Sequence, residues 1–342
     1  MEPIPTSQRI PLPPFPRGWF AIAFSAELEL GAVARRHYFG RELVVYRTES
    51  GRVSLTDAYC PHLGAHLGHG GRVEGERLVC PFHGWQFEPD GSCAAMPYGK
   101  RIPDRARLSP WQVIEQNGVV LAYWDGVDGS GAAAAWKPPV VDLSAYSEMR
   151  SRTWELQSHP QEVMENSADG AHFRYIHKTH YMDVAEQPVV DDSSFDIVFQ
   201  TNPEGVVEAD RAPEGTPDLR YHVIVYGPGL VHGFMRPGGA DVSTLSRVYV
   251  TPIDGERVDM RVVSNVAAGG DPAVVDAIAE ATAQATFEQV ADDVVIWGNK
   301  RYQPQPPLND EESAIAVFRR WYQQFYPAVQ GGAAAAGAEG RA

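Results

Sequence analysis

Four side chains near the start of the chain have the types and the spacing of metal ligands. Cys60 and His62 form a Cys-x-His pair, and after seventeen intervening residues Cys80 and His83 form a Cys-x-x-His pair. Two thiolates and two imidazoles can hold a tetrahedral zinc ion. The same set can hold a [2Fe–2S] cluster in which two histidines replace two cysteines on one iron.

The distribution of these ligands favours the iron–sulfur cluster. Zinc sites usually place both thiolates on one arm, at C-x₂₋₄-C spacing, whereas each arm here offers one thiolate and one imidazole. Each arm can therefore give its cysteine to one iron and its histidine to the other. The alternatives are a zinc site, or core cysteines beside incidental histidines. His66 and His69 are not predicted as ligands because the set is already complete, and Cys93 is predicted to be a small buried residue.

A second group of potential ligands lies in MENSADGAHFRYIH, residues 164–177. Asp169 and His172 are three residues apart and are predicted to share a helical face. His172 and His177 are five apart, so we expect the helix to break or kink near Gly170. Two imidazoles and one carboxylate form the facial triad of non-haem Fe(II) sites, which leaves positions open for O₂ and substrate. Taken alone, the pattern also fits an ordinary polar helix.

The carboxylate of such a triad should come from another part of the chain. The C-terminal segment ADDVVIWGNK offers Asp292 and Asp293. Successive helical residues point about 100° apart, so only one of the two is expected to face the metal. Asn166 fits a position beside the metal ligands and a surface position equally well, and Glu165 receives no role.

Short strands are predicted around the first ligand set. Residues 42–48, 76–82 and 118–124 are rich in β-branched and aromatic residues, which predicts a small antiparallel β domain over residues 15–126. Gly, Ala and Pro dominate the segment that follows, and we place a linker or loop at residues 127–138. The second, iron-binding domain is expected over residues 139–327, and a disordered tail over residues 328–342.

The second domain is predicted to alternate strands and helices. A strand at residues 152–157 precedes a helix that opens at Pro160. Further strands are predicted at residues 196–200, 219–227, 244–253 and 258–267. The clearest helix covers residues 271–298, with Asp271 as its N-cap, Pro272 in its first turn and Gly298 in the left-handed position after its end.

Bulk composition excludes several classes of protein. The 342 residues carry a net charge of −15, which argues against a nucleic-acid partner. Three cysteines are too few for a disulfide scaffold and fit a reducing compartment. The Pro-rich N-terminus resembles no signal peptide, and no run of about 18 apolar residues predicts a membrane span. These features predict a cytoplasmic protein.

The two ligand patterns together resemble the oxygenase (α) subunit of Rieske non-haem iron oxygenases, over roughly residues 15–327. The quoted residues are C-x-H…C-x-x-H followed by N-x-x-D-x-x-H-x₄-H. The sequences D-V-x-I-W-x-x-K near residues 293–300 and R-R-W-Y-x-Q-F-Y at residues 319–326 are similar to the branch of 3-ketosteroid 9α-hydroxylases and cholesterol 7-desaturases. The second arm, CPFHGWQF, instead matches generic ring hydroxylases.

The resemblance implies a role for each candidate residue. Cys60, His62, Cys80 and His83 would hold a Rieske [2Fe–2S] cluster, and the mononuclear Fe(II) ligands would be His172, His177 and Asp293. Asp169 would bridge that iron to the cluster of a neighbouring subunit in a head-to-tail homotrimer. The implied fold is α+β, with an N-terminal all-β Rieske domain and a C-terminal helix-grip (START-like) domain built on a curved antiparallel sheet.

The function implied is hydroxylation of a large apolar substrate, steroid-like or polycyclic, with O₂. Alternatives are sterol desaturation, hydroxylation of an aromatic or secondary-metabolite substrate, and a Rieske electron carrier or a zinc-stabilised module with a lipid-binding domain. No G-x-G-x-x-G follows a predicted strand, so a separate NAD(P)H-dependent reductase or ferredoxin must supply electrons. Apolar side chains of residues 192–200 and of 221–234, which we interpret as a strand, are expected to line the pocket or to serve as ordinary core.

Overall fold

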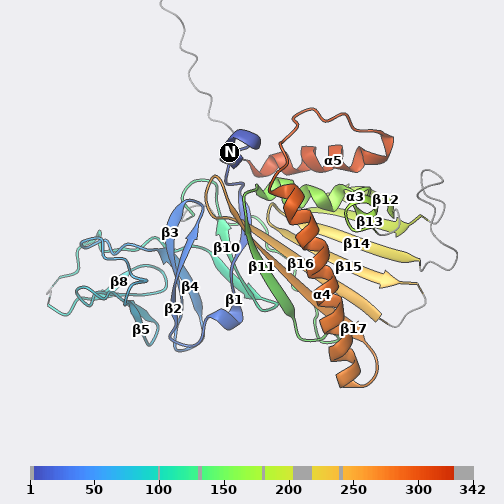
Figure 1. The fold of residues 1–342 in the computed structure, drawn as a ribbon. Helices are drawn as coiled ribbons and strands as arrows, with labels where there is room; N and C mark the ends of the chain where they lie inside the picture. The colour runs from blue at the N-terminus through green and yellow to red at the C-terminus, as the bar shows by residue number, and fades with distance from the viewer. Residues whose placement is uncertain are drawn as a thin grey trace, which may run out of the picture.

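The computed structural model describes residues 4–98, 101–129, 133–178, 182–202, 218–238 and 242–326; the predicted tail at residues 328–342 lies outside them. Within these ranges the strands form four antiparallel sheets, three small and one large. Figure 1 shows the small sheets on one side of the molecule and the large sheet, with the long helix α4 across it, on the other. The predicted α+β class is confirmed.

The small sheets are built from the first third of the chain. One sheet has the order β1 (Gly18–Phe24), β10 (Val119–Trp124), β9 (Val113–Gln116). A second contains β2 (Val33–Tyr38), β3 (Arg41–Arg47) and β4 (Val53–Asp57), and a third contains β5 (Arg72–Glu74), β6 (Arg77–Val79), β7 (Gln86–Phe87) and β8 (Cys93–Ala95). The two ligand arms are the loop after β4 and the loop between β6 and β7, so short strands hold both arms at their bases.

The large sheet has seven strands among the described residues. Their order is β11 (Arg150–Leu156), β17 (Val258–Ala268), β16 (Val242–Pro252), β15 (Leu230–Pro237), β14 (Leu219–Tyr226), β13 (Ser194–Thr201) and β12 (Met182–Val190). β17 is buried along nearly its whole length, because α4 covers one face and the β1–β10 layer packs on the other through Trp19, Leu121 and Val263. A strand covered on both faces needs apolar residues at consecutive positions.

Residues 221–234 form a hairpin, so our interpretation of them as one strand is wrong. β14 ends at Tyr226 and pairs back onto β15 from Leu230. The Gly-Pro-Gly sequence at 227–229 makes the turn, and Gly227 has φ +58°, in the left-handed region that glycine tolerates. Trp136 occupies the place where a Cβ of Gly227 would lie.

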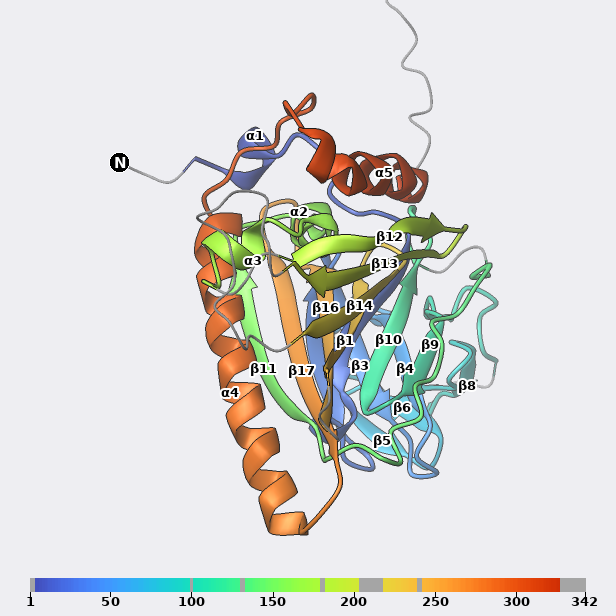
Figure 2. The same cartoon turned by 90° about the vertical axis from the view of Figure 1, so that its right-hand side faces the viewer.

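The helices are α1 (Thr6–Arg9), α2 (Pro160–Met164), α3 (His172–Tyr175), α4 (Pro272–Trp297) and α5 (Ser313–Tyr322); the 3₁₀ turns are η1 (Ser25–Glu27), η2 (Glu165–Ala168), η4 (Asp310–Glu312) and η5 (Gln323–Phe325). Asp271 caps α4 as predicted, accepting a hydrogen bond from the Ala273 amide. The left-handed conformation predicted for Gly298 is wrong, because its φ is −67° and the chain continues in a right-handed turn. Figure 2 shows α4 lying along the large sheet, with α2 and α3 beside its C-terminal end.

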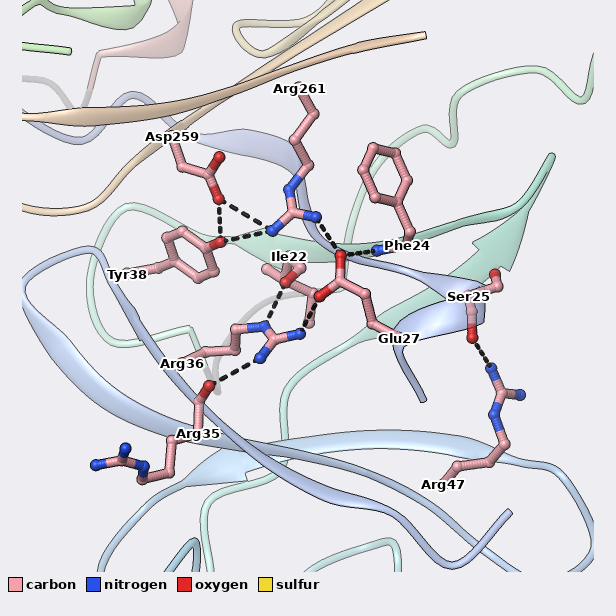
Figure 3. A network of polar contacts seen from close by, with 10 residues as sticks. All are labelled: Ile22, Phe24, Ser25, Glu27, Arg35, Arg36, Tyr38, Arg47, Asp259 and Arg261. Carbon is pink, nitrogen blue, oxygen red and sulfur yellow. Dashed lines mark hydrogen bonds and ion pairs between the residues drawn. The ribbon is translucent and has the colours of Figure 1, made fainter. Parts of the chain in front are cut away.

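A buried polar network joins the small sheets to the large one (Figure 3). Arg261 of β17 donates to Glu27 at 2.6 Å, to Asp259 at 3.0 Å and to the hydroxyl of Tyr38 at 3.2 Å. The Tyr38 hydroxyl in turn donates to Asp259, and Arg36 donates to Glu27 at 2.6 Å. Burial, with the Asp259 charge beside it, raises the pKa of Tyr38, so the phenol stays a neutral donor.

Among the described residues, no helix combines the length and the apolar character that a membrane crossing requires.

Candidate metal centres

The two cysteine–histidine loops share one backbone design. In each loop the glycine four residues after the cysteine donates its amide to the cysteine carbonyl at 3.0 Å, and the cysteine amide donates to the carbonyl of the residue after that glycine. Gly64 and Gly84 have φ of +72° and +70°, where glycine is favoured. Cys60 and Cys80 therefore occupy equivalent positions in two matching loops, although their histidines differ by one position.

All four predicted cluster ligands meet where these loops face each other. The rings of His62 and His83 lie 4.6 Å apart, and the indole of Trp85 stacks on His62 at 4.5 Å and 11°. Cys60 and Cys80 are buried and form no disulfide. Burial raises the pKa of the Cys60 thiol to about 12; such a thiol becomes a thiolate ligand when a metal ion replaces its proton.

The remaining groups around the loops leave the four ligands free for a cluster. The Nδ1 atom of His62 is buried and has no hydrogen-bond partner among the described residues, as expected for an atom that faces a metal. His66 instead lies 3.4 Å from Glu42, and His69 contacts Arg35 at 3.1 Å. Cys93 is only half-buried, in contrast to the prediction, because it lies on the short outer strand β8. The donor set therefore fits a [2Fe–2S] cluster.

The second group of ligands depends on a break in the helix. α2 and η2 end at Ala168, and Asp169 is extended, with φ −103° and ψ 103°. The break lies where we expected it, at Asp169 and Gly170; a Cβ on Gly170 would lie 2.6 Å from the Met182 carbonyl oxygen. The predicted shared helical face of Asp169 and His172 is wrong because Asp169 is outside the helix. Its carboxylate instead accepts hydrogen bonds from the amides of Ala171 and His172, at 3.0 and 3.3 Å, just before and at the start of α3.

This break lets two histidines and one carboxylate converge. One potential ligand atom from each of His172, His177 and Asp293 lies within 4.8 Å of the others. His177 Nε2 is 3.4 Å from Asp293 Oδ2. Asp293 is only 6% exposed whereas Asp292 is exposed, so the structure distinguishes the two carboxylates that the sequence left open. A buried aspartate on a helix face that otherwise packs on a sheet marks a functional position.

A hydrogen bond to the backbone sets the tautomer of His172. His172 Nδ1 contacts the backbone carbonyl of Asp169, and because a carbonyl can only accept, this nitrogen carries the proton. The lone pair of His172 is therefore on Nε2, which faces the site. Burial lowers the pKa of His172 and keeps the ring neutral. Two imidazoles and a single carboxylate fit a divalent iron.

Asn166 belongs to this site. Its amide nitrogen lies 3.1 Å from His172 Nε2 and 3.5 Å from Asp293 Oδ2. From the sequence alone, a surface position for Asn166 is an equally good prediction. The available signal was the N-x-x-D spacing, which places Asn166 one turn before the break.

The three converging ligands line one wall of an apolar cavity. The cavity and its mouth together enclose about 740 Å³ of space not filled by protein atoms, part of it open to solvent. No lysine or arginine is among the described lining residues. The apolar lining comes from α2, α3, α4 and the large sheet, and consists of Val163, Met164, Phe173, Phe199, Tyr221, Val223, Val231, Val248, Val262, Val290 and Trp297. Phe199 lines it as expected, whereas Phe195 packs on Phe318 in the core.

Two family models match the chain. The Rieske [2Fe-2S] domain matches residues 18–106, and the 3-ketosteroid 9alpha-hydroxylase C-terminal domain matches residues 123–326.

Curated relatives align over nearly the whole chain. A cholesterol 7-desaturase of Ciona intestinalis is 34% identical over 92% of this chain and 70% of its own length. A probable 3-ketosteroid-9-alpha-monooxygenase, oxygenase component, of Rhodococcus rhodochrous is 30% identical over 92% of this chain and 81% of its own.

Solved structures share the fold at low sequence identity. Dicamba monooxygenase bound to dicamba superposes with a TM-score of 0.71 at 19% identity, over 90% of this chain and 96% of the other. A caffeine complex of NdmA from Pseudomonas putida gives 0.69 at 18% identity, over 93% and 90%. The two-part architecture described above is therefore an established one.

Proposed function

The chain belongs to the Rieske oxygenases with a 3-ketosteroid 9α-hydroxylase C-terminal domain, and we propose that it hydroxylates a large apolar, steroid-like substrate with O₂. The protein is an oxidoreductase whose cofactors are a Rieske [2Fe–2S] cluster and a mononuclear iron. In this proposal Cys60, His62, Cys80 and His83 hold the cluster. When bound, the cluster stores and passes on electrons, and the iron supplies the oxygen chemistry.

One observation carries the proposal: His172, His177 and Asp293 converge on the wall of an apolar cavity. These side chains are placed to hold the iron directly against a bound substrate. The valine and aromatic lining would exclude water and favour burial of an uncharged, rigid ring system. The absence of cations from the described lining argues against an anionic substrate, and the names of the two relatives support a steroid or sterol.

We propose further that the cluster passes electrons to the iron site of a neighbouring copy in a head-to-tail homotrimer. Apolar side chains beside the cluster ligands are largely exposed, namely Leu63 (65%), Phe82 (62%) and Tyr98 (63%). Such a patch favours contact with another protein surface. Asp169 lies between η2 and His172, and in this proposal its carboxylate would accept a hydrogen bond from a cluster histidine of that copy.

A separate NAD(P)H-dependent reductase or ferredoxin would deliver the electrons. The relative from Rhodococcus rhodochrous is named as an oxygenase component, which supports a divided system. The exposed patch of Leu63, Phe82 and Tyr98 would also be open to this partner before the copies engage.

Incubation of the reconstituted enzyme with a steroid and terpenoid panel under ¹⁸O₂ tests the reaction. Mass spectrometry should show one labelled oxygen atom in the product of a steroid-like substrate. An unlabelled product that has lost two hydrogens would support the second candidate, sterol desaturation, which the 34% identity to a cholesterol 7-desaturase favours. Consumption of no substrate in the whole panel, by protein loaded with both metals, would contradict the proposal.

A further inference from the structure

The iron ligands come from segments that are distant in sequence and must be aligned by contacts outside the metal site. His172 and His177 follow α2 and η2, whereas Asp293 lies on α4, more than a hundred residues later. We infer that two ion pairs with buried carboxylates, Glu162–Lys300 and Glu165–Arg319, position these segments for metal binding. The inference rests on the proposed function, because it takes these three ligands as the iron site.

The first pair joins α2, the helix before the two histidines, to the end of α4, the helix that carries Asp293. Glu162 lies on α2 and its side chain is fully buried, at 0% exposure; Lys300 Nζ lies 3.0 Å from its Oε2. The Lys300 amide donates to the Ile296 carbonyl at 2.8 Å, which fixes Lys300 to the last turn of α4. That turn starts just after Asp293, so any shift of α2 along α4 must stretch this ion pair.

Arg9 strengthens the same junction from the N-terminal helix. Its guanidinium donates to the carbonyls of Lys300, at 2.5 Å, and Gln157, at 2.9 Å. Gln157 directly follows β11, shortly before α2 begins. The start of α2 and the end of α4 are therefore tied together by backbone contacts as well as by the ion pair.

The second pair holds the residue next to the metal site. Arg319 of α5 donates to both oxygens of Glu165, at 2.6 and 2.8 Å, and both side chains are nearly buried. Two parallel hydrogen bonds fix the relative orientation of the groups as well as their distance. Asn166, which contacts His172 and Asp293, follows Glu165 in the η2 turn.

The sequence RRWYQQFY at residues 319–326, which contains Arg319, makes further contacts that hold α2 and η2 in place. Besides Arg319, Tyr326 of this sequence donates its hydroxyl to Gln161 of α2 at 2.7 Å. Tyr322 donates to the Pro228 carbonyl in the β14–β15 turn at 2.8 Å. Three side chains of one C-terminal segment thus attach α2 and η2 to the large sheet.

The energetic cost of the two ion pairs indicates that they fix the relative position of these segments and do not only add stability. Forming the two ion pairs takes both carboxylates out of water, and the attraction within such pairs often fails to exceed that cost. Apolar residues of similar volume could pack α2 against α4 and α5 about as well. What the ion pairs add is a fixed register between the segments, which metal affinity requires because ligand atoms must be held within a few tenths of an ångström.

A tether at the opposite end of α4 provides a matched control. Arg150 of β11 pairs with Glu280 at 3.0 Å and with Asp276, in the first half of α4. This tether also joins α4 to its neighbour, but it lies more than three helical turns from Asp293. Its loss should weaken packing without moving the metal ligands.

The test measures Co(II) affinity of the mononuclear site in protein that keeps its [2Fe–2S] cluster and has had the mononuclear metal removed by a chelator. The variants are Lys300→Met, Arg319→Lys, the charge-conserving Lys300→Arg and the control Arg150→Met. Loss of groups that orient metal ligands typically weakens affinity by roughly 10- to 100-fold. We expect Lys300→Met and Arg319→Lys to fall in this range, with Lys300→Arg recovering much of the loss and Arg150→Met staying near wild type.

Visible absorbance of the cluster confirms that each variant is folded. If Lys300→Met fails to fold, Arg319→Lys still tests the inference, because it keeps the positive charge and changes only the geometry of the contact. Wild-type Co(II) affinity in both Lys300→Met and Arg319→Lys, or an equal loss in Arg150→Met, would overturn the inference while leaving the proposed function intact. Failure of the wild-type protein itself to bind Co(II) would overturn the proposed function and this inference with it.

Discussion

The two candidate metal centres differ in how their ligands are distributed along the chain. The proposed cluster ligands lie within residues 60–83 and come from two loops with the same backbone turn. The proposed iron ligands come from a broken helix at residues 160–177 and from α4. A local site depends on its own loops, whereas a site made from distant segments depends on the packing between them.

The centres also differ in their surroundings. The cluster histidines are half-buried beside exposed apolar side chains, whereas Asp293 and the side chain of His177 are almost fully buried. Residues 18–106 contain ten basic and ten acidic residues, so the net charge of −15 arises in the rest of the chain. An uncharged, partly open centre suits contact with protein partners, and a closed apolar one suits chemistry on a small molecule.

Replacing a cluster cysteine should have the largest effect. Cys60→Ser removes a thiolate that serine cannot replace as a ligand, so we expect loss of about two iron atoms per chain, loss of visible absorbance and no turnover. The mononuclear iron should remain, because its ligands belong to the other part of the molecule. Metal analysis checks both statements, and loss of all iron would show that the centres are not independent.

Asp293→Ala should remove the mononuclear iron and abolish turnover while the cluster spectrum is unchanged. Asp292→Ala is the matched control, because its side chain is the exposed neighbour on the same helix. Iron content and the visible spectrum of both variants make the comparison. Equal iron loss in the two variants would contradict the assignment of Asp293, and not Asp292, as the iron ligand.

Asp169 connects the two centres in our account, so its replacement should stop turnover with both metals bound. Asp169→Ala also removes the hydrogen bonds that the carboxylate accepts from the amides of Ala171 and His172, at a cost of about 1 kcal/mol. Asp169→Asn keeps an oxygen that can accept the Ala171 amide and removes only the charge. Turnover near the wild-type rate in Asp169→Asn, measured with saturating reductase, would speak against a charged bridge.

The contact between the two parts of the chain should give the smallest effect. Tyr38→Phe removes hydroxyl contacts to Asp259 and Arg261, and we expect a loss of about 1–2 kcal/mol in the free energy of unfolding. Both metal contents should be unchanged, because the network lies between the centres and touches neither ligand set. Denaturant unfolding with iron analysis tests this, and a loss of either metal would link the interface to the sites.

The same difference in locality explains what could be predicted from the sequence. The cluster site can be recognised from the sequence as C-x-H…C-x-x-H, because each loop carries its two ligands within a few residues of each other. The choice between Asp292 and Asp293 could not be derived from spacing, since it depends on which face of α4 meets the sheet. Glu165 and Arg319 are 154 residues apart, and no local pattern indicates that they pair.

Turns were the other source of error. The Gly-Pro-Gly sequence at residues 227–229 reverses the chain, but alternating apolar residues on both sides resemble one continuous strand. The prediction of a left-handed conformation for Gly298 rests on residue type alone. In the structure the backbone at Gly298 is right-handed, and Lys300, two residues later, pairs with Glu162.

Electron paramagnetic resonance of the purified, metal-loaded protein tests the central claim of two iron centres in one chain most directly. After reduction with dithionite we predict a rhombic signal from the [2Fe–2S] cluster, and on addition of nitric oxide a second, high-spin signal from the mononuclear Fe(II). Absence of the rhombic signal from a sample containing iron and acid-labile sulfide would contradict the account.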